Sequence, residues 1–305
     1  MAQDIMMHTQ GILKQEFFNP AYNSFKDYAS FSLLNKYQWT GSMNGAPKTY
    51  AVNAYIPVKL SGLGFGITAI TEEIGLRNKV SFTGNLSHNV KVGENGYLAF
   101  GYGIGMQNIS YNTQKMKTYE GSEITSDINS TDYNFALGMF YYGNSYFAGL
   151  STNVLVSGTD YTGGQILPGV DVTTGYVHRF SESLLLKPEM ILKYYPVRST
   201  YYQSAEASKS RAKPVLDLGI NALLMSRMWL GTSFRIKQAW TFSADVIIKD
   251  AFKLGYTFEW GVGKGINQFN SHGIRLVWNL IPSYALKGFN RSSRYKGAII
   301  DEIYR

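Results

Sequence analysis

The segment Phe-Lys-Leu-Gly-Tyr-Thr-Phe-Glu-Trp, residues 252–260, decides the fold class of this chain. Its apolar side chains stand at every second position, so they share one face of a strand, whereas a helix would spread them around its axis. The apolar face ends in three aromatic residues, Tyr256, Phe258 and Trp260. Aromatic residues gathered toward one end of an alternating strand are typical of the interfacial girdle of a membrane β-barrel.

The same alternation recurs along the chain, most clearly in residues 28–39 and 270–281. Each segment is near the length that a tilted strand needs to cross a bilayer. We predict fourteen strands, at residues 28–39, 48–57, 63–72, 79–90, 96–110, 131–142, 145–156, 170–180, 183–195, 214–225, 227–238, 240–249, 251–261 and 270–281.

The connections between these segments sort by length. Those after even-numbered strands are short, such as 143–144, whereas those after odd-numbered strands include 111–130, 157–169 and 196–213. Membrane barrels have tight turns on one rim and long loops on the other. We therefore predict an all-β protein, a transmembrane antiparallel up-and-down β-barrel of about fourteen strands. A soluble β-sandwich is the alternative, but it gives no reason for loop length to follow strand parity.

The chain divides into three predicted parts. Residues 1–27 are a periplasmic N-terminal arm, 28–281 the transmembrane β-barrel and 282–305 a periplasmic C-terminal tail. No apolar signal-peptide core follows Met1, so we expect a mature outer-membrane protein that starts near Gln3, its signal peptide already removed. The chain has no run of about 18 apolar residues, which excludes transmembrane helices.

Composition excludes several functional classes. Charged residues make up 16% of the 305, below the level of about a quarter that is usual in soluble domains. The chain has no cysteine, which excludes disulfides, cysteine zinc sites and thiol nucleophiles. The net charge is +8, but the 29 basic residues are scattered, so we predict no nucleic-acid binding.

Catalytic patterns are missing from the sequence. None of the four histidines has a His, Asp or Glu at metal-ligand spacing on the same strand face. Ser271 and His272 are adjacent in a predicted strand, so they point to opposite faces and cannot form a dyad. We predict that the protein is not an enzyme and has no catalytic residue, no metal site and no cofactor. An outer-membrane hydrolase that depends on a histidine is the alternative.

Strand parity also predicts which polar side chains face the lumen. They carry both signs of charge with a positive excess, and we favour a self-neutralising network that fills the barrel, because buried charges must pair whatever the function. The alternative is a docking surface for an acidic or carboxylate-bearing partner. The predicted inward residues are Lys36, Gln38, Asn134, Lys187, Glu189, Lys193, Asp217, Asn221, Arg235, Lys237, Glu259, Arg275 and Asn279. Of the residues near this surface, the candidates for partner binding are Gln38, Trp39, Arg235, Lys237 and Arg275.

Three glycines, Gly101, Gly103 and Gly105, share the inner face of the strand predicted at 96–110. Glycine weakens a strand, so this stripe needs a reason. Sheet curvature is the interpretation we favour. The alternative is that a backbone, from the N-terminal arm or from a partner, packs closely against the stripe, and the three glycines are therefore further candidates for partner binding.

Several segments together resemble one protein family. They are Phe-Asn-Pro-Ala-Tyr at 18–22, Gln-Trp-Thr-Gly at 38–41, Gly-Ala-Pro-Lys-Thr at 45–49, Met-Trp-Leu-Gly-Thr-Ser-Phe-Arg at 228–235, Leu-Gly-Tyr-Thr-Phe at 254–258 and Ser-His-Gly-Ile at 271–274. The chain resembles the PorP/SprF family of Bacteroidetes outer-membrane proteins, which is associated with type IX secretion and gliding motility. Where that family commonly has Ala-Gly after Asn-Pro-Ala-Tyr, this chain has Asn23 and Ser24.

The resemblance implies a non-enzymatic outer-membrane barrel. Such a protein is either a core subunit of the secretion apparatus, in contact with its periplasmic or outer-membrane components, or the dedicated partner of a secreted surface protein of adhesin type. In the second case the barrel binds, anchors or helps to secrete the surface protein by contacting the C-terminal domain of that surface protein. Loops 111–130, 157–169 and 196–212 would supply specificity. A diffusion channel or transporter in the outer-membrane lipid is the alternative, because a polar lumen also allows it.

Overall fold

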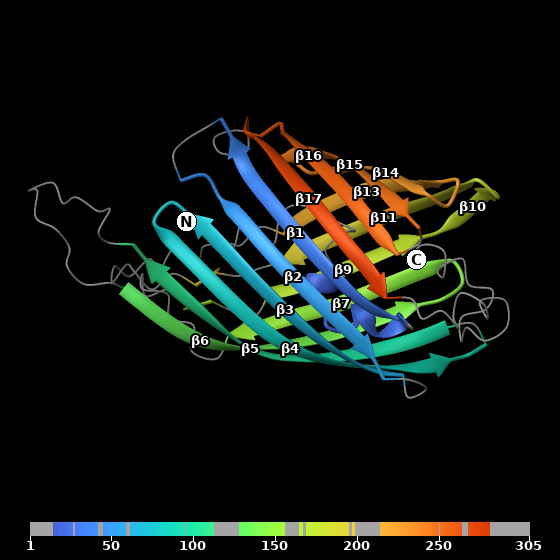
Figure 1. The fold of residues 1–305 in the computed structure, drawn as a ribbon, viewed down its shortest axis with the longest axis horizontal. Coiled ribbons are helices and arrows are strands. Elements are labelled where there is room, and N and C mark those ends of the chain that lie inside the picture. The colour runs from blue at the N-terminus through green and yellow to red at the C-terminus, as the bar shows by residue number, and fades with distance from the viewer. Residues whose placement is uncertain are drawn as a thin grey trace, which may run out of the picture.

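A β-sheet closed on itself makes up most of the protein (Figure 1). The computed structural model describes residues 15–26, 28–41, 45–58, 62–94, 96–112, 128–155, 165–166, 169–194, 197–198, 214–249, 251–263 and 268–280. The strands of the wall are β1 Ala29–Thr40, β2 Lys48–Pro57, β3 Leu63–Ile74, β4 Arg77–Val92, β5 Gly96–Tyr111, β6 Ile128–Tyr142, β7 Tyr146–Leu155, β9 Gly169–Tyr176, β11 Leu184–Tyr194, β13 Val215–Leu224, β14 Met228–Arg235, β15 Ala239–Ile248, β16 Phe252–Gly261 and β17 Asn270–Leu280.

Each wall strand pairs antiparallel with the next one along the chain. The ring closes because β1 pairs with β17, which places Ala29 opposite Leu280. A further strand, β10 His178–Ser181, continues β9 beyond Val177 and pairs with β11. The predicted fold class, an antiparallel barrel of about fourteen strands, is confirmed. The predicted strand at 170–180 is divided into β9 and β10 at Val177.

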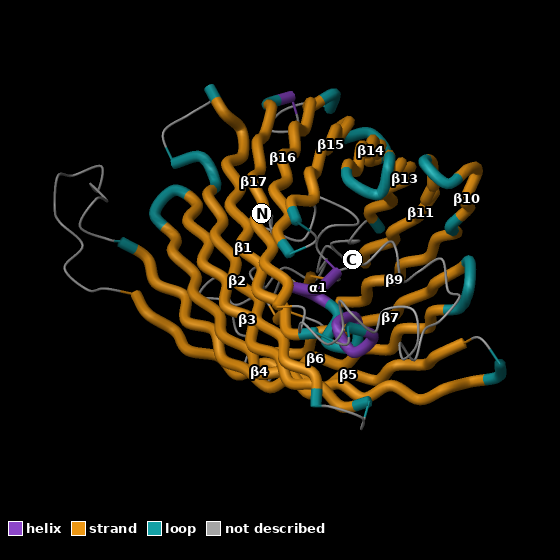
Figure 2. Tube along the Cα trace, turned by 45° about the vertical axis from the view of Figure 1, so that its right-hand side comes forward, coloured by secondary structure: helices purple, strands orange, loops and turns teal. Residues whose placement is uncertain are grey.

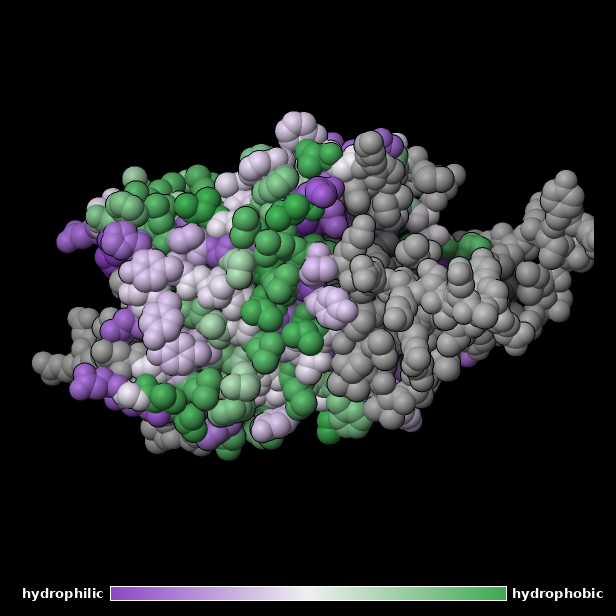
Figure 3. Space-filling model, turned by 180° about the vertical axis from the view of Figure 1, so that it is seen from behind, coloured by the Kyte–Doolittle hydropathy of each residue, from purple (hydrophilic) through white to green (hydrophobic). Residues whose placement is uncertain are grey.

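The two faces of the wall differ as the alternation predicts. In β16, Phe252, Leu254 and Tyr256 are exposed on the outside, whereas Thr257 and Glu259 are buried on the inside. Exposed Val, Ile, Leu, Phe and aromatic side chains recur on the outer face of the other strands, and Figure 3 shows a broad hydrophobic area on one side of the molecule. A soluble monomer rarely exposes so much contiguous apolar surface, whereas a barrel in a bilayer must do so.

The rims of the barrel differ in the length of their connections. Short turns follow β2, β4, β6, β10, β13 and β15, and at this rim β1 begins and β17 ends. The opposite rim carries the loops for which the sequence predicts partner recognition, and most of loops 111–130, 157–169 and 196–212 lie outside the described residues. Two short strands in these loops, β8 Gln165–Ile166 and β12 Val197–Arg198, pair with each other. The predicted C-terminal tail, residues 282–305, also lies outside the described residues.

The described part of the N-terminal arm, residues 15–26, lies inside the ring. It contains the single helical turn α1 Gln15–Phe18 and the 3₁₀ turn η3 Tyr22–Phe25, and Figure 2 shows α1 surrounded by the strands of the wall. Among the described residues no helix has the length and apolar character needed to cross a membrane. The prediction that the arm belongs to the periplasmic side stays a prediction, but its described part, residues 15–26, packs against the inner face of the barrel.

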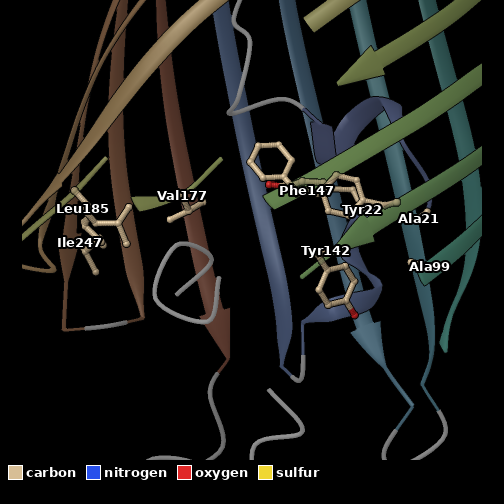
Figure 4. Close-up of a cluster of buried hydrophobic side chains, with 10 residues drawn as sticks. Ala21, Tyr22, Ala99, Tyr142, Phe147, Val177, Leu185 and Ile247 are labelled. Carbon is tan, nitrogen blue, oxygen red and sulfur yellow. The ribbon is translucent and has the colours of Figure 1, made fainter. Parts of the chain in front are cut away.

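An apolar cluster lines the lumen near the short-turn rim. Tyr22 of the arm and Phe147 of β7 lie close together in it, and Leu185 and Ile247 reach in from another part of the wall (Figure 4). Because these wall residues lie near the ends of their strands, the apolar layer is at one end of the barrel and the charged layer lies further in. The buried members of the cluster are Ala21, Tyr22, Ala99, Phe140, Tyr142, Phe147, Val177, Leu185, Leu223 and Ile247.

Candidate functional site

The candidate site is the place where the N-terminal arm meets the glycines of the wall. A Cβ atom at Gly101 in β5 would collide with the backbone of Pro20 and Ala21. A Cβ at Gly138 in β6 would collide with the Asn19 side chain and would lie 2.9 Å from the Pro20 ring. Only glycine allows the arm backbone to approach the sheet this closely. We call the wall around Gly101 and Gly138 the arm seat.

A compact turn at residues 19–22 fits into this arm seat. The Asn19 side chain accepts a hydrogen bond from the Ala21 backbone N–H at 3.0 Å and donates one to the Met139 carbonyl of β6 at 3.1 Å. It therefore holds the turn closed and attaches it to the wall at the same time. Ala21 is 0% exposed, and the Tyr22 ring meets Phe140 edge-to-face at 5.1 Å between centroids. The Asn-Pro-Ala-Tyr segment singled out in the sequence is thus the part of the arm that touches the seat.

Further contacts attach the arm to other sides of the ring. The Asn53 side chain of β2 donates to the Glu16 carbonyl at 3.1 Å, and the Asn89 side chain of β4 donates to the Ser24 carbonyl. The Gln15 amide donates to the Thr173 hydroxyl of β9. The Lys193 ammonium group of β11 lies 5.3 Å from the centre of the Phe18 ring. The arm therefore crosses the lumen and joins strands that are distant in the ring.

The two charged residues in the described part of the arm, Glu16 and Lys26, pair with each other. The Lys26 Nζ lies 3.1 Å from a Glu16 carboxylate oxygen, and it also donates to the Ser30 hydroxyl at 3.2 Å. Burial by itself would raise the pKa of Glu16, but the nearby cations Lys26 and Arg275 outweigh it and hold that pKa below its ordinary value of 4.5. Glu16 is therefore a carboxylate at neutral pH, and its ion pair closes residues 16–26 into a loop.

The wall of the lumen carries its own ion pairs. Arg235 of β14 lies 2.8 Å from Asp217 of β13 and 3.6 Å from Glu259 of β16, which is also 3.5 Å from Lys36 of β1. Arg275 of β17 lies 3.0 Å from Asp245 of β15. A self-neutralising network, as predicted for these inward residues, is therefore present. Binding of a partner by the same residues stays a prediction.

The remaining candidate residues lie in different surroundings. Gln38 is buried on the inner face, where its backbone N–H donates to the Pro47 carbonyl at 2.9 Å. Trp39 lies at the end of β1, in an irregular stretch of the β1–β17 pairing, with a φ of 53°. The prediction that Lys237 points into the lumen is wrong: β14 ends at Arg235, and Lys237 is exposed in the turn to β15 with a φ of 62°. The turn interrupts the alternation of inward and outward side chains, and the inward orientation of Lys237 was predicted from that alternation.

The three candidate glycines lie in different surroundings. Gly101 supports the alternative that the backbone of the arm packs on the stripe. Cβ atoms at Gly103 and Gly105 would instead meet neighbouring strands of the wall: the Asn85 side chain at Gly103, and the Phe82 carbonyl oxygen at Gly105. Gly138 is not among the residues predicted from the sequence, although its place beside Ala136 on one face of an alternating strand was a usable signal.

A small cavity lies between the described part of the arm and the wall. This cavity of about 30 Å³, large enough for water, is lined by Gln15, Phe18, Asn19, Gly149, Ser151, Asp171, Thr173, Ile191 and Lys193. No group of three or more His, Asp or Glu side chains in the described part of the chain is arranged to hold a metal ion.

Comparison with solved structures supports the fold alone. The toluene transporter TodX of P. putida is 11% identical, with 86% of this chain and 91% of that chain covered and a TM-score of 0.51. A Pseudomonas aeruginosa FadL homologue is 11% identical over 87% of this chain and 93% of its own, with a TM-score of 0.49. The Acinetobacter baumannii outer membrane protein Omp33 is 9% identical over 84% and 100%, with a TM-score of 0.48. A search of curated proteins found no match.

A family model gives the assignment that these remote structures do not. The model of the type IX secretion system membrane protein PorP/SprF matches residues 2–277, which include the described arm and nearly all of the wall. The match includes both the Asn-Pro-Ala-Tyr turn and the glycines on which it rests. The chain therefore belongs to the PorP/SprF family of type IX secretion system membrane proteins.

Proposed function

We propose that this protein is a non-enzymatic barrel of the outer membrane. It binds a secreted surface protein, and it does so through the C-terminal domain of that surface protein. In that role it anchors the partner at the cell surface or assists its secretion. Membership of a type IX secretion family supports a role in protein export. The apolar outer face and the closed ring support a location in a membrane.

The observation that carries this proposal is a lumen adapted to a polypeptide. The wall holds residues 15–26 through hydrogen bonds to backbone carbonyls, as from Asn53 and Asn89, and through glycines that admit a backbone. A path for small solutes needs open space, whereas this lumen is crossed by the arm and lined by paired charges. Contact with protein therefore suits the lumen better than free diffusion does.

The direct test is purification of the tagged protein from its own outer membrane in mild detergent, followed by mass spectrometry. We expect a large surface protein in stoichiometric amount. Recovery of periplasmic components in its place would instead make the protein a core subunit of the apparatus.

A diffusion channel is the second candidate, supported by the polar side chains on the inner wall. Planar-bilayer recordings separate the two functions. A large, stable conductance of the intact protein would contradict the anchoring role and support a channel, whereas the arm across the lumen leads us to expect little conductance.

A further inference from the structure

The arm seat recognises its occupant by shape and backbone, and the contacts involved are uncharged. Gly101 and Gly138 accept the turn at residues 19–22, Met139 accepts a hydrogen bond through its carbonyl, and Phe140 meets an aromatic ring. None of these contacts requires that the turn be covalently joined to β1. A peptide with a small residue followed by an aromatic one would make the same contacts.

The ion pairs of the arm and of the wall are separate, so the arm can leave the lumen without breaking an ion pair. Glu16 takes Lys26 with it, because both partners of that ion pair belong to the arm. Arg275 attracts Glu16, yet its own ion pair with Asp245 lies within the wall and remains when the arm departs. The pairs of Arg235 with Asp217 and of Lys36 with Glu259 likewise do not involve the arm. Departure therefore leaves these ion pairs intact, and breaking one by removal of a single partner is the costly event inside a protein.

Departure of the arm does disrupt hydrogen bonds and apolar contacts between the arm and the wall. The side chains of Asn53 and Asn89 release carbonyls of the arm, and Phe17 leaves its contact with Leu34. The wall groups set free are amides, hydroxyls, apolar side chains and the Lys193 ammonium group, which loses the Phe18 ring. A second polypeptide supplies carbonyls and an aromatic ring of the same kind, so exchange of one peptide for another conserves these interactions.

We propose that the arm seat is an exchangeable peptide-binding site: the N-terminal arm is its resident ligand, and a segment of the secreted partner displaces it. The segment is an uncharged turn with a small residue on Gly101 and an aromatic residue on Phe140. This inference rests on the proposed function for the identity of the partner. The peptide chemistry of the site follows from the arm and the wall alone.

The first experiment separates the arm from the barrel without changing how the protein folds. A protease site is inserted at residue 27, between arm and β1, and the full chain is purified in its folded state and then cut. A fluorescent synthetic peptide of residues 15–26 is added, and its binding is followed by fluorescence anisotropy. We expect the peptide to bind the cut protein and to bind the uncut protein at least tenfold more weakly.

A matched peptide with Ala21→Leu is the control, because Ala21 is fully buried in the apolar cluster and a larger side chain must displace its neighbours. We expect it to bind at least tenfold more weakly than the unaltered peptide. Failure of the unaltered peptide to enter a cut barrel that keeps its strand content, or equal binding of both peptides, would overturn the proposal.

The second experiment fixes the arm in place. The chain has no cysteine, so Gln15→Cys with Thr173→Cys gives a unique pair for a cleavable thiol cross-linker across the contact between arm and β9. Ser233→Cys with Thr241→Cys joins the paired wall strands β14 and β15 by the same chemistry and leaves the arm free to move. We expect the locked arm to reduce capture of the surface protein identified by co-purification at least tenfold, with recovery after reduction, and the control pair to have no effect.

The outcomes of the two experiments are distinct. If the protein captures the surface protein equally well with a locked arm and with a released arm, the proposal that this partner displaces the arm is wrong. Absence of capture in both states would contradict the proposed function and displacement by that partner together. The first experiment does not involve the partner. Binding of the synthetic peptide therefore decides by itself whether the arm seat exchanges peptides.

Discussion

At the scale of single residues, the glycines of β5 and β6 show how the sequence prepares the wall for the arm. Gly101 and Gly138 lie at the closest approach of arm and wall, whereas a Cβ at Gly84 of β4 would come no nearer than 3.8 Å to the Ile104 carbonyl oxygen, its nearest described neighbour. Glycine is therefore present for different structural reasons at different positions of the wall. At Gly101 the reason is a neighbouring backbone that is about eighty residues away in the sequence.

We expect Gly101→Val to destabilise the protein and to loosen the arm. The added side chain must displace the backbone of Pro20 and Ala21, and overpacking of this kind costs about 1–3 kcal/mol. Thermal unfolding in detergent and the rate of proteolysis within residues 15–26 measure the two effects. Gly84→Val is the matched control, since its space is open, and equal effects of the two substitutions would show that strand glycines as such matter rather than the contact.

A second expectation at this scale concerns Asn19. Replacement by Ala removes the hydrogen bond to Met139 and the one from the buried Ala21 N–H, and a buried N–H that loses its acceptor costs about 1–3 kcal/mol. We expect Asn19→Ala to speed proteolysis of the arm while the far-ultraviolet circular dichroism of the strands stays unchanged. An arm as resistant as the unaltered one would mean that its apolar contacts alone hold it.

At the scale of elements, the arm is a closed loop whose ends are joined by the ion pair of Glu16 and Lys26. The helical turn α1 and the 3₁₀ turn η3 are too short to be stable alone, so their shape depends on this pair and on the wall. An element of this kind is expected to respond as a unit when one of its tethers is lost. Glu16 is the tether that solution conditions can change.

We expect docking of the arm to depend on pH through Glu16. Its pKa in the folded protein lies below the ordinary value of 4.5, so its contribution to stability is present above that value and is lost as pH falls through the lowered pKa. Proteolysis of the arm by an acid-stable protease should therefore accelerate at acidic pH and be constant near neutrality. In Glu16→Gln this acceleration should be reduced, and an unchanged pH profile would assign the effect to other groups.

At the scale of the whole molecule, the barrel is a boundary between two environments. The outer face carries Ile274 and Tyr256 in the middle of paired strands, and the inner face beside them carries Arg275 and Glu259. Alternation along every strand places these environments on the two sides of a single sheet. The position of each residue relative to the membrane therefore follows from its parity wherever the strand is regular.

We expect Ile274→Arg to destabilise the protein in a bilayer by about 2–4 kcal/mol, because it places a charge on the lipid face near the middle of the wall. Reversible unfolding from liposomes measures the change. Ser181→Arg, at the exposed short-turn end of β10, is the control and should cost much less. Equal effects at the two positions would contradict the assignment of the outer face to lipid.

Sequence alone determined the features that repeat along the chain. Alternation predicted the strands, their faces and the all-β barrel, because the period of a strand is written in neighbouring residues such as those of 252–260. It failed at Lys237, where a turn with positive φ interrupts the period. Only the tertiary structure decided that Asn19 and Ala21 rest on Gly138 and Gly101 inside the barrel, and that Lys36 pairs with Glu259. Those contacts join segments that the sequence leaves far apart, and closure of the ring is what brings them together.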